Sequence, residues 1–245
     1  MARRRKRRPS PHRGSVTVVF IHGAGCTAEV FAAQTGAIPD AIALTLPGHA
    51  TPGAPATIEE FADAVTNELA ARELRDVILC GHSMGGAIAL ELALRREPRV
   101  RAIAMLSSGA RLRVAPAVLE QIETDFETAS RELPRYFYAQ PSPEQLAAST
   151  RMMLAVGAAQ TLRDFRACDA FDRIDRLGEV SLPLLALTGE RDVMTPPKFA
   201  LALADRVPGA QARIVPQAGH LALAERPGDV NEALRAFVNH VESSI

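Results

Sequence analysis

Short, continuous apolar runs alternate along this chain with longer segments whose apolar residues recur at helical spacing. The short runs are rich in β-branched residues and are bounded by Gly, Pro or Asp, which is typical of buried strands. Six strands are predicted, within the stretches 15–23, 40–49, 76–81, 100–110, 182–190 and 210–220. Buried strands that alternate with helices favour a parallel sheet with helices on both faces.

The helical pattern is clearest between the second and third predicted strands. There Thr57 is followed three residues later by Glu60, which predicts a capping box at a helix N-terminus. The helix after the third strand has almost no polar face until its end, so we expect it to be buried. Helices between the strands are predicted over 57–74, 84–98, 196–209 and 227–244.

One long segment interrupts the alternation of strands and helices. From about residue 111 to residue 177 there is no strand pattern, and helices are predicted within 116–133 and 143–171. The segment follows the fourth strand, and helical insertions at the end of a parallel sheet commonly act as lids. The sequence therefore predicts one α/β domain over 14–245 with a helical lid insertion at about 111–177.

The composition of the chain is consistent with a single domain that has one large hydrophobic core. The chain has 245 residues, of which 47% are hydrophobic, and this is enough for a single domain of substantial size. Seven of its 28 Lys and Arg residues precede Gly14. The remaining 21 basic residues stand against 28 acidic ones, so the rest of the chain has a net charge of −7. We expect no nucleic acid to bind the folded body, and we expect residues 1–13 to form a disordered basic tail.

The cysteines and the apolar runs limit the location of the protein. The three cysteines are Cys26, Cys80 and Cys168, an odd number without a C-x-x-C pair, so neither a disulfide framework nor a zinc site is expected. No apolar run reaches the length of a membrane span, and no secretory pattern follows the basic start. A cytoplasmic location without membrane attachment is expected, whereas the oligomeric state is not set by the sequence.

The motif Gly81-His82-Ser83-Met84-Gly85 is the strongest chemical signal in the chain. It follows a predicted strand and opens a predicted helix, which is the context that a nucleophile elbow requires. Such a turn presents the serine hydroxyl at the end of the strand. The backbone N–H of Met84, at the helix N-terminus, is then placed to bind an oxyanion. The alternative interpretation is a glycine-rich turn that contains a serine by chance.

A serine nucleophile needs a base, and that base needs an acid to orient it. His220 lies in the loop after the last predicted strand, and Asp192 follows the strand before it. Taken singly, Asp192 would be a turn or helix-capping residue and His220 a surface histidine. Together with Ser83 they predict a catalytic triad. Glu190 and Asp205 are the alternative acids, but one is very near the strand end and the other is inside a predicted helix.

The loop after the first predicted strand, His22-Gly23-Ala24-Gly25, is expected to supply the second oxyanion donor. The backbone N–H of Ala24 is the first candidate and that of Gly25 the second. Five other residues near these motifs are expected to be structural, with the histidines supporting loops and the cysteines filling apolar space. They are His22, His49, His82, Cys26 and Cys80.

Taken together, the pieces HGAG, LPGH, GHSMGG, LTGERDVMTP and AGHLALAERP resemble the α/β-hydrolase superfamily, in its branch of lidded serine esterases, lipases and C–C hydrolases. The resemblance extends from about Val16 to the C-terminus. It implies the α/β-hydrolase fold, with helices on both faces of a mostly parallel sheet. Family members often have two further N-terminal strands. Here only the basic tail precedes Ser15, so a six-stranded sheet is expected.

The resemblance implies a serine hydrolase that acts on carboxylic esters, or on thioesters, through an acyl-enzyme on Ser83. A C–C bond hydrolase or lyase that uses the same triad is an alternative, as are lactonase, amidase and perhydrolase chemistry. A ligand-binding protein on a retained hydrolase fold is the alternative of another class. The serine nucleophile disfavours epoxide hydrolases and dehalogenases, whose nucleophile is Asp. The expected partner is a small ester or related acyl compound, and no cofactor or metal is required.

The predicted lid offers two weaker indications of the substrate. Apolar side chains at helical spacing could line an acyl pocket, although such residues more often belong to a core. These residues are Phe137, Met152, Met153 and Leu154. Arginines in the same segment could clamp an acidic substrate, but a solvated face is the favoured interpretation. They are Arg131, Arg135, Arg151, Arg163 and Arg166.

Overall fold

A single parallel sheet organises the protein. The computed structural model describes residues 16–244, so the predicted basic tail lies outside the described residues. The strand order is β2-β1-β3-β4-β5-β6, and each neighbouring pair is parallel. The predicted six-stranded sheet is therefore confirmed, with every pair parallel. The strands are β1 (Thr17–Ile21), β2 (Ile42–Leu44), β3 (Val77–His82), β4 (Val100–Leu106), β5 (Leu184–Gly189) and β6 (Gln211–Val215).

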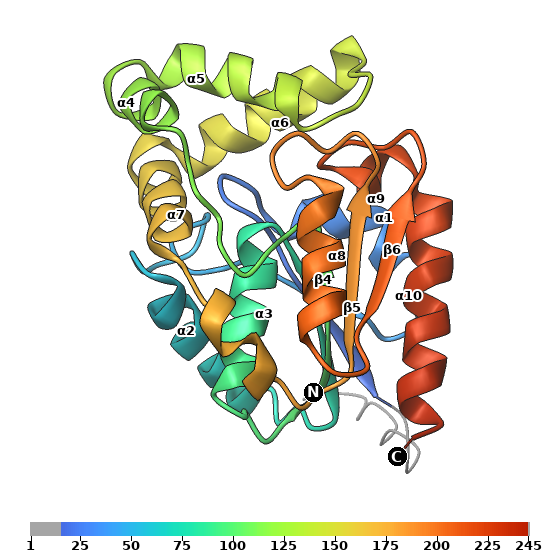
Figure 1. The fold of residues 1–245 in the computed structure, drawn as a ribbon. Coiled ribbons are helices and arrows are strands. Elements are labelled where there is room, and N and C mark those ends of the chain that lie inside the picture. The colour runs from blue at the N-terminus through green and yellow to red at the C-terminus, as the bar shows by residue number, and fades with distance from the viewer. Residues whose placement is uncertain (1–15, 245) are drawn as a thin grey trace, which may run out of the picture.

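Helices connect the strands and cover both faces of the sheet (Figure 1). Before β4 they are the 3₁₀ helix η1 (Ala28–Phe31), α1 (Ala32–Thr35), α2 (Ile58–Ala71) and α3 (Met84–Leu94). Between β4 and β5 they are α4 (Pro116–Thr124), α5 (Phe126–Glu132), η2 (Leu133–Tyr136), α6 (Pro143–Val156), α7 (Ala158–Ala170) and η3 (Ile174–Glu179). After β5 they are α8 (Pro197–Arg206), α9 (Ala222–Glu225) and α10 (Pro227–Glu242).

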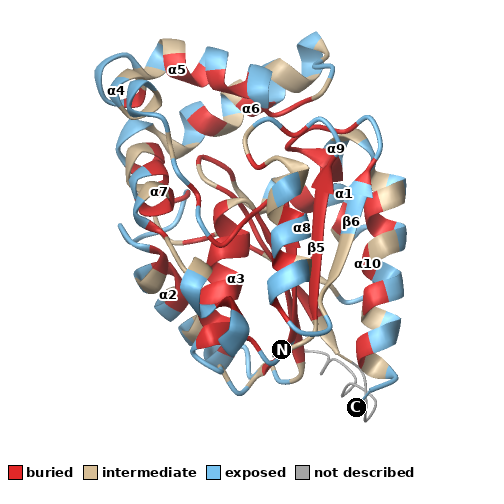
Figure 2. Ribbon diagram, viewed as in Figure 1, coloured by how far each residue is buried: buried red, intermediate tan, exposed pale blue. Residues whose placement is uncertain are grey.

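The two faces of the sheet belong to two separate apolar clusters. Val19 and Ile21 of β1 pack in one cluster with residues of α2, α3 and α8. Val18 and Phe20 of the same strand pack in the other cluster with residues of α10. This division follows from the strand geometry, because successive side chains point to opposite faces. Figure 2 shows β5 buried between its partners, while α10 has an exposed outer face.

The helix α3 lies in the middle of the core. All of its residues from Met84 to Leu94 are buried, as its nearly continuous apolar pattern predicts. At the start of α2, the Thr57 side chain accepts a hydrogen bond from the Glu60 N–H at 3.1 Å. The Glu60 carboxylate accepts from the N–H of Ala56 at 2.7 Å rather than from that of Thr57. One of the two hydrogen bonds of the predicted capping box is therefore present. In the other, the Glu60 carboxylate binds the N–H of the residue before Thr57.

The residues between β4 and β5, 107–183, are called the inserted segment below. Its helices α4, α5 and α6 lie beyond the end of the sheet to which the arrowheads of β5 and β6 point (Figure 1). An antiparallel bridge between Arg111 and Asp172 joins the two ends of its helical part. The inserted segment therefore covers the carboxyl edge of the sheet, where parallel α/β proteins bind their ligands.

The helices of the inserted segment are shorter than the sequence pattern suggests. The stretch 116–133 is divided at Asp125, whose backbone is not helical (φ −145°, ψ 71°) and whose side chain accepts from the Thr128 N–H to start a new helix. The stretch 143–171 is divided at Gly157, with φ 86°. The short elements η1, α1 and α9 were not predicted. Each has four residues, which is too few for a periodic pattern.

Candidate active site

Ser83 lies on the turn between β3 and α3 with φ 52° and ψ −116°. An L-residue rarely adopts a positive φ, and the surrounding hydrogen bonds hold it in this strained conformation. Its N–H donates to the Leu106 carbonyl at 2.9 Å, and its carbonyl accepts from the Gly86 N–H at 2.9 Å. The Ser108 hydroxyl donates to the same Ser83 carbonyl at 2.7 Å. The turn is therefore held from β4 as well as from its own helix.

The glycines that flank Ser83 allow the strand and the helix to approach each other. A Cβ atom on Gly81 would lie 2.0 Å from the Gly85 carbonyl oxygen, and one on Gly85 would lie 2.0 Å from the Ile21 carbonyl oxygen. Both distances are far below van der Waals contact, so neither position has room for a side chain. This explains physically why the motif has glycine two residues before and two residues after its serine.

Asp192 follows β5 and is buried at 3% exposure. One carboxylate oxygen accepts from the N–H groups of Met194 and Thr195, both at 2.9 Å. The other accepts from the Thr195 hydroxyl at 2.8 Å and the Thr188 hydroxyl at 3.2 Å. Burial alone would raise the pKa of Asp192. The charge of protonated His220 and the hydrogen bonds from His220 and Thr195 outweigh burial and hold this pKa well below its usual range.

His220 follows β6, and its Nδ1 donates to Asp192 Oδ2 at 2.9 Å. This bond occupies Nδ1 and leaves Nε2 as the ring nitrogen without a carboxylate partner. His220 and Ser83 both line one cavity of about 140 Å³. Among the described residues, the Ser83 hydroxyl has no hydrogen bond to His220, and such bonds are often long before substrate binds. The structure thus brings the three predicted residues to one site, with the acid and base already joined.

The two alternative acids lie in other environments. Glu190 accepts a hydrogen bond from the Gln217 N–H at 3.0 Å on the exposed surface. Asp205 is within α8. Neither has a hydrogen bond to His220 in the described part of the chain, so Asp192 is the acid that the geometry favours.

The candidate oxyanion loop passes directly beside the nucleophile. A Cβ on Gly23 would lie 2.9 Å from His82 Nδ1 and 3.1 Å from Ser83 Cβ. Ala24, the next residue, lines the cavity together with Ser83. The N–H of Gly25, the second candidate, donates instead to Asp164 Oδ2 at 2.9 Å. Of the two candidates, Ala24 is therefore the one whose N–H remains available.

The Met84 N–H is the other predicted oxyanion donor. Met84 is the first residue of α3, so its N–H belongs to the first turn, where no carbonyl within the helix can accept it. The positive end of the helix dipole adds to its attraction for a developing negative charge. Met84 adjoins Ser83 in the chain, whereas Ala24 approaches the nucleophile from the loop after β1.

The three nearby histidines, His22, His49 and His82, are all buried. His22 Nδ1 donates to the Gly23 carbonyl at 2.9 Å, and Nε2 accepts from the Leu46 N–H at 3.0 Å. His82 Nε2 donates to the His220 carbonyl at 3.1 Å. Burial, with the neighbouring His49, lowers the pKa of His22 to about 3. Burial, with the neighbouring His220, lowers the pKa of His82 to about 3. Both rings are therefore neutral at physiological pH.

The cysteines beside the cavity are protonated thiols. Cys26 lines the cavity, and burial followed by the nearby Asp164 charge raises its pKa to about 12. Burial also raises the pKa of Cys80. A thiol that keeps its proton is a poor nucleophile, so Cys26 acts as a small apolar group in the cavity wall and Cys80 as one in the apolar core.

The cavity is lined mainly by apolar side chains, which come from the loops after β1, β5 and β6, from α8 and from the inserted segment. Phe137, which the sequence suggested, lines it together with Leu112, Val114 and Phe165. Met152 and Met153 line a second cavity of about 170 Å³, which shares Phe137, Cys26 and Leu221 with the first. Leu154 is 46% exposed and lines neither cavity. The predicted apolar set is therefore divided between two cavities and the solvent.

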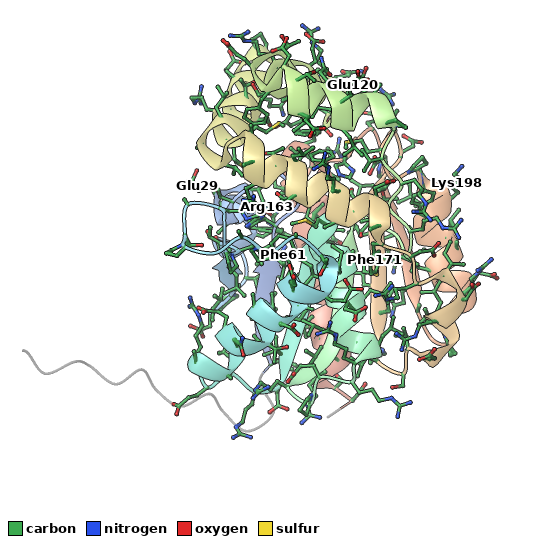
Figure 3. The ribbon with its side chains drawn as sticks, turned by 90° about the vertical axis from the view of Figure 1, so that its left-hand side faces the viewer. Glu29, Phe61, Glu120, Arg163, Phe171 and Lys198 are labelled. Carbon is green, nitrogen blue, oxygen red and sulfur yellow. The ribbon has the colours of Figure 1, made fainter. Side chains whose placement is uncertain are left out.

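The five arginines that were weighed as a possible clamp do not line the cavity beside Ser83. Arg131 pairs with Glu127, Arg135 with Glu132, and Arg166 with Glu123. Arg163, labelled in Figure 3, donates to the side chain of Gln160 on the same helix at 2.9 Å. Arg151 is exposed. A solvated face, which the sequence favoured, accounts for these contacts.

Sequence reasoning missed several residues at the site. Arg111 and Arg113, at the start of the inserted segment, line the cavity and pair with Asp172 at 2.7 and 3.4 Å. Thr195 binds the candidate acid, and its position three residues after Asp192 was an available signal. No local pattern indicates Asp164, whose bonds to Gly25 and His49 join residues more than a hundred positions apart.

A family model for the alpha/beta hydrolase family matches residues 18–233. The chain belongs to the alpha/beta hydrolase family. The match spans every strand after the first residue of β1, together with the inserted segment. The resemblance that the sequence motifs suggested is therefore confirmed, and the protein is a hydrolase of this family.

Similar proteins include hydrolases of esters and lactones. A pimeloyl-[acyl-carrier protein] methyl ester esterase of Neisseria meningitidis is 29% identical over 89% of this chain and 75% of its own. The structure of an N-acyl homoserine lactone degrading enzyme is 29% identical and has a TM-score of 0.81. The match covers 91% of this chain and 93% of that enzyme. A thermophilic esterase is 28% identical, with a TM-score of 0.82 and coverage of 91% of this α/β hydrolase and 90% of the esterase.

Two features of the described residues bear on metals and membranes. Within 16–244, no cluster of three or more His, Cys, Asp or Glu residues is arranged to hold a metal ion. In the same range, none of the helices combines the length and the apolar character that a membrane crossing requires.

Proposed function

We propose that this protein hydrolyses carboxylic esters through an acyl-enzyme on Ser83. The observation that carries the proposal is the buried Asp192–His220 pair beside a cavity that Ser83 and His220 both line. A similar ester hydrolase of 28% identity supports the same bond class. The cavity walls are largely apolar, which favours an ester with an apolar acyl or alcohol part.

In the proposed first step, the Ser83 hydroxyl attacks the ester carbonyl while His220 Nε2 takes its proton. Asp192 keeps the proton on Nδ1 and stabilises the imidazolium that forms. The backbone N–H groups of Ala24 and Met84 stabilise the oxyanion. His220 then protonates the leaving alcohol. Water attacks the acyl-enzyme with His220 as base, and this releases the acid and regenerates Ser83.

The test uses p-nitrophenyl butyrate with the wild type and with Ser83→Ala. We expect the variant to lose more than about 10³-fold in kcat. Its melting temperature should change little, because Ala makes the same backbone bonds. Ser243→Ala, on the exposed C-terminal residues, is the matched control and should be unchanged. A fluorophosphonate should add covalently to the Ser83 peptide of the wild type and of the control, and not to Ser83→Ala. Retention of most activity in Ser83→Ala would reject the nucleophile.

Lactone hydrolysis is a second candidate, because one similar structure, 29% identical, is described as an N-acyl homoserine lactone degrading enzyme. The chemistry is the same, except that the leaving alcohol stays attached to the acyl group. A panel of esters, thioesters, lactones and β-diketones separates the alternatives by their products. Esters with a terminal carboxylate belong in the panel, because Arg111 and Arg113 line the cavity. A ligand-binding protein would show no turnover of any member.

A further inference from the structure

A buried carboxylate of the inserted segment reaches the candidate oxyanion loop. Asp164, on α7, is 0% exposed. Its Oδ2 accepts from the Gly25 N–H at 2.9 Å and binds His49 Nε2 at 2.7 Å. Its Oδ1 accepts from the Gln160 side-chain amide at 2.8 Å. We propose that Asp164 is a positioning residue that orients the candidate oxyanion donor. This inference rests on the proposed hydrolase function.

The peptide geometry explains how Asp164 could affect catalysis without touching substrate. The Gly23 carbonyl accepts from the Cys26 N–H at 3.3 Å and from His22 Nδ1 at 2.9 Å. Because a trans peptide directs its C=O and N–H in opposite directions, these bonds turn the Ala24 N–H away from that pair. The Gly25 N–H bond to Asp164 fixes the next peptide. Both peptides that flank Ala24 are thus held in place, the second by the inserted segment.

The contacts of His49 tie Asp164 to a second backbone segment. His49 Nδ1 lies 3.1 Å from the Pro47 carbonyl oxygen. Its Nε2 lies 2.7 Å from Asp164 Oδ2. Both side chains are fully buried, so removal of either one would leave polar atoms of the other without a partner, which is costly.

The groups that face this pair are all uncharged. The His22 ring meets the His49 ring edge-on at 4.6 Å. The pKa of His22 is lowered to about 3 by burial and then by His49, so its Nε2 stays free to accept the Leu46 N–H. The thiols of Cys26 and Cys168 have pKa values raised by burial and by Asp164. Asp164 is therefore the carboxyl group that binds His49 in this part of the core.

Packing contacts as well as the hydrogen bond of Asp164 join α7 to the loop that carries Ala24. A Cβ on Gly25 would lie 3.4 Å from both Met153 Cγ and Thr161 Cγ2, so α6 and α7 already contact the loop. Gln160 approaches Gly48 so closely that a Cβ there would lie 2.3 Å from its side-chain oxygen. Figure 3 shows this part of the molecule, with Arg163 on α7 above Phe61 of α2. A shift of α7 would therefore move the loop that carries Ala24.

The experiment compares Asp164→Ala and Asp164→Asn with Asp169→Asn as a matched control. Asp169 is on the same helix and binds a backbone N–H, that of Val114, at 3.0 Å, but it does not contact the oxyanion loop. Asn at 164 keeps an acceptor for the Gly25 N–H and should rescue part of the effect. Should Asp164→Ala fail to fold, Asp164→Asn and His49→Gln test the same link.

We expect kcat to fall about 100-fold in Asp164→Ala and about tenfold in Asp164→Asn, with KM changed less than about threefold. Loss of one oxyanion donor costs about 10²–10³-fold, so a misplaced donor should cost part of that. Inhibition by a boronic acid, which forms a tetrahedral adduct with serine, should weaken in parallel with kcat. Amide hydrogen exchange of residues 22–26 should be faster in the Asp164 variants than in the wild type. It should be unchanged in the Asp169→Asn control.

Two results would overturn the inference while the proposed function stands. One is a lowered melting temperature in Asp164→Ala with wild-type kcat and boronic acid affinity. The other is an equal loss of kcat in Asp169→Asn, which would indicate general damage to α7. By contrast, wild-type turnover that survives Ser83→Ala would overturn the proposed function and this inference with it.

Discussion

The nucleophile turn, residues 81–86, and the inserted segment, residues 107–183, line the same cavity but are built by different means. In the turn, backbone atoms contact backbone atoms, and a Cβ on Gly81 or Gly85 would lie 2.0 Å from a carbonyl oxygen. In the inserted segment, a Cβ on Gly157 or Gly178 would meet nothing within 4 Å, and one on Gly109 would first meet a side chain, at 2.8 Å from Phe199 Cδ2. Its contribution to the cavity comes from side chains such as Phe137 and Phe165.

This difference separates the chemistry from the selection of substrate. A turn made of backbone contacts tolerates almost no change, so it holds the reacting serine in one conformation. A wall made of side chains can be altered one residue at a time, while the helices that carry them stay folded. The exceptions in the inserted segment are residues such as Asp164, which contact the turn's neighbours directly.

The largest expected effect tests the acid that serves the turn. Asp192→Asn should lower kcat about 10⁴-fold, because an amide N–H₂ facing His220 Nδ1 forces the wrong tautomer. Glu190→Gln is the control and should stay within about threefold, since Gln still accepts the Gln217 N–H. Steady-state kinetics with p-nitrophenyl butyrate measure both variants. If Glu190→Gln proved the more damaging change, the acid would have to be reassigned.

A pair of glycine variants tests the comparison most directly. Gly85→Ala should destabilise the protein by more than about 4 kcal/mol, because its Cβ would lie 2.0 Å from the Ile21 carbonyl. This corresponds to a melting temperature lower by about 10 °C or more for a domain of this size. Gly178→Ala, in open space, should change stability by less than about 1 kcal/mol. Equal thermal shifts in the two variants would contradict the contrast between the regions.

Acid should lower the free energy of unfolding through the histidines near the nucleophile turn. The inserted segment cannot contribute in this way, because its sequence contains no histidine. The pKa values of His22 and His82 are lowered to about 3 from 6.5, so the unfolded state binds more protons between these values. The free energy of unfolding should therefore fall as pH decreases from 6.5 towards 3, by about 2 kcal/mol for each histidine at pH 5. Urea unfolding at pH 8 and pH 5 measures this.

A variant without one of these histidines supplies the control for the pH experiment. His82→Gln should be less stable than the wild type at pH 8, because the side chain is buried. Its free energy of unfolding should, however, fall by about 2 kcal/mol less than that of the wild type between pH 8 and pH 5. An unchanged pH dependence in His82→Gln would show that this ring is not the group that takes up the proton.

The smallest expected effect separates two neighbouring residues of the inserted segment. Met153 is 1% exposed and Leu154 is 46% exposed. Met153→Ala should cost about 2–3 kcal/mol by leaving a cavity, and it should enlarge the second cavity, which Met153 lines. Leu154→Ala should stay within about 0.5 kcal/mol. Thermal melts and rates with esters of increasing acyl length measure the pair. Equal stability of both variants would contradict the assignment of Met153 to the packed core.

The sequence by itself determined the strands and the type of sheet. Continuous apolar runs reveal buried strands because both faces of a parallel sheet are covered. The motif around Ser83 also carries its own geometry, since Gly81 permits the close contact between β3 and α3, and Gly85 permits the one between α3 and β1. Asp192 and His220 could be proposed from their places after consecutive strands, because the carboxyl ends of parallel strands meet at one edge.

Only the tertiary structure decided which groups meet across long separations in the chain. The Gly25 N–H is occupied by Asp164, 139 residues away, so the choice between Gly25 and Ala24 depended on where α7 packs. The same packing brings Arg111 rather than Arg163 to the cavity wall and buries Met153 while leaving Leu154 exposed. Such outcomes depend on how helices dock and where they break, as at Asp125 and Gly157. Local hydrophobic periodicity does not encode the docking, because many helix orientations bury the same apolar face.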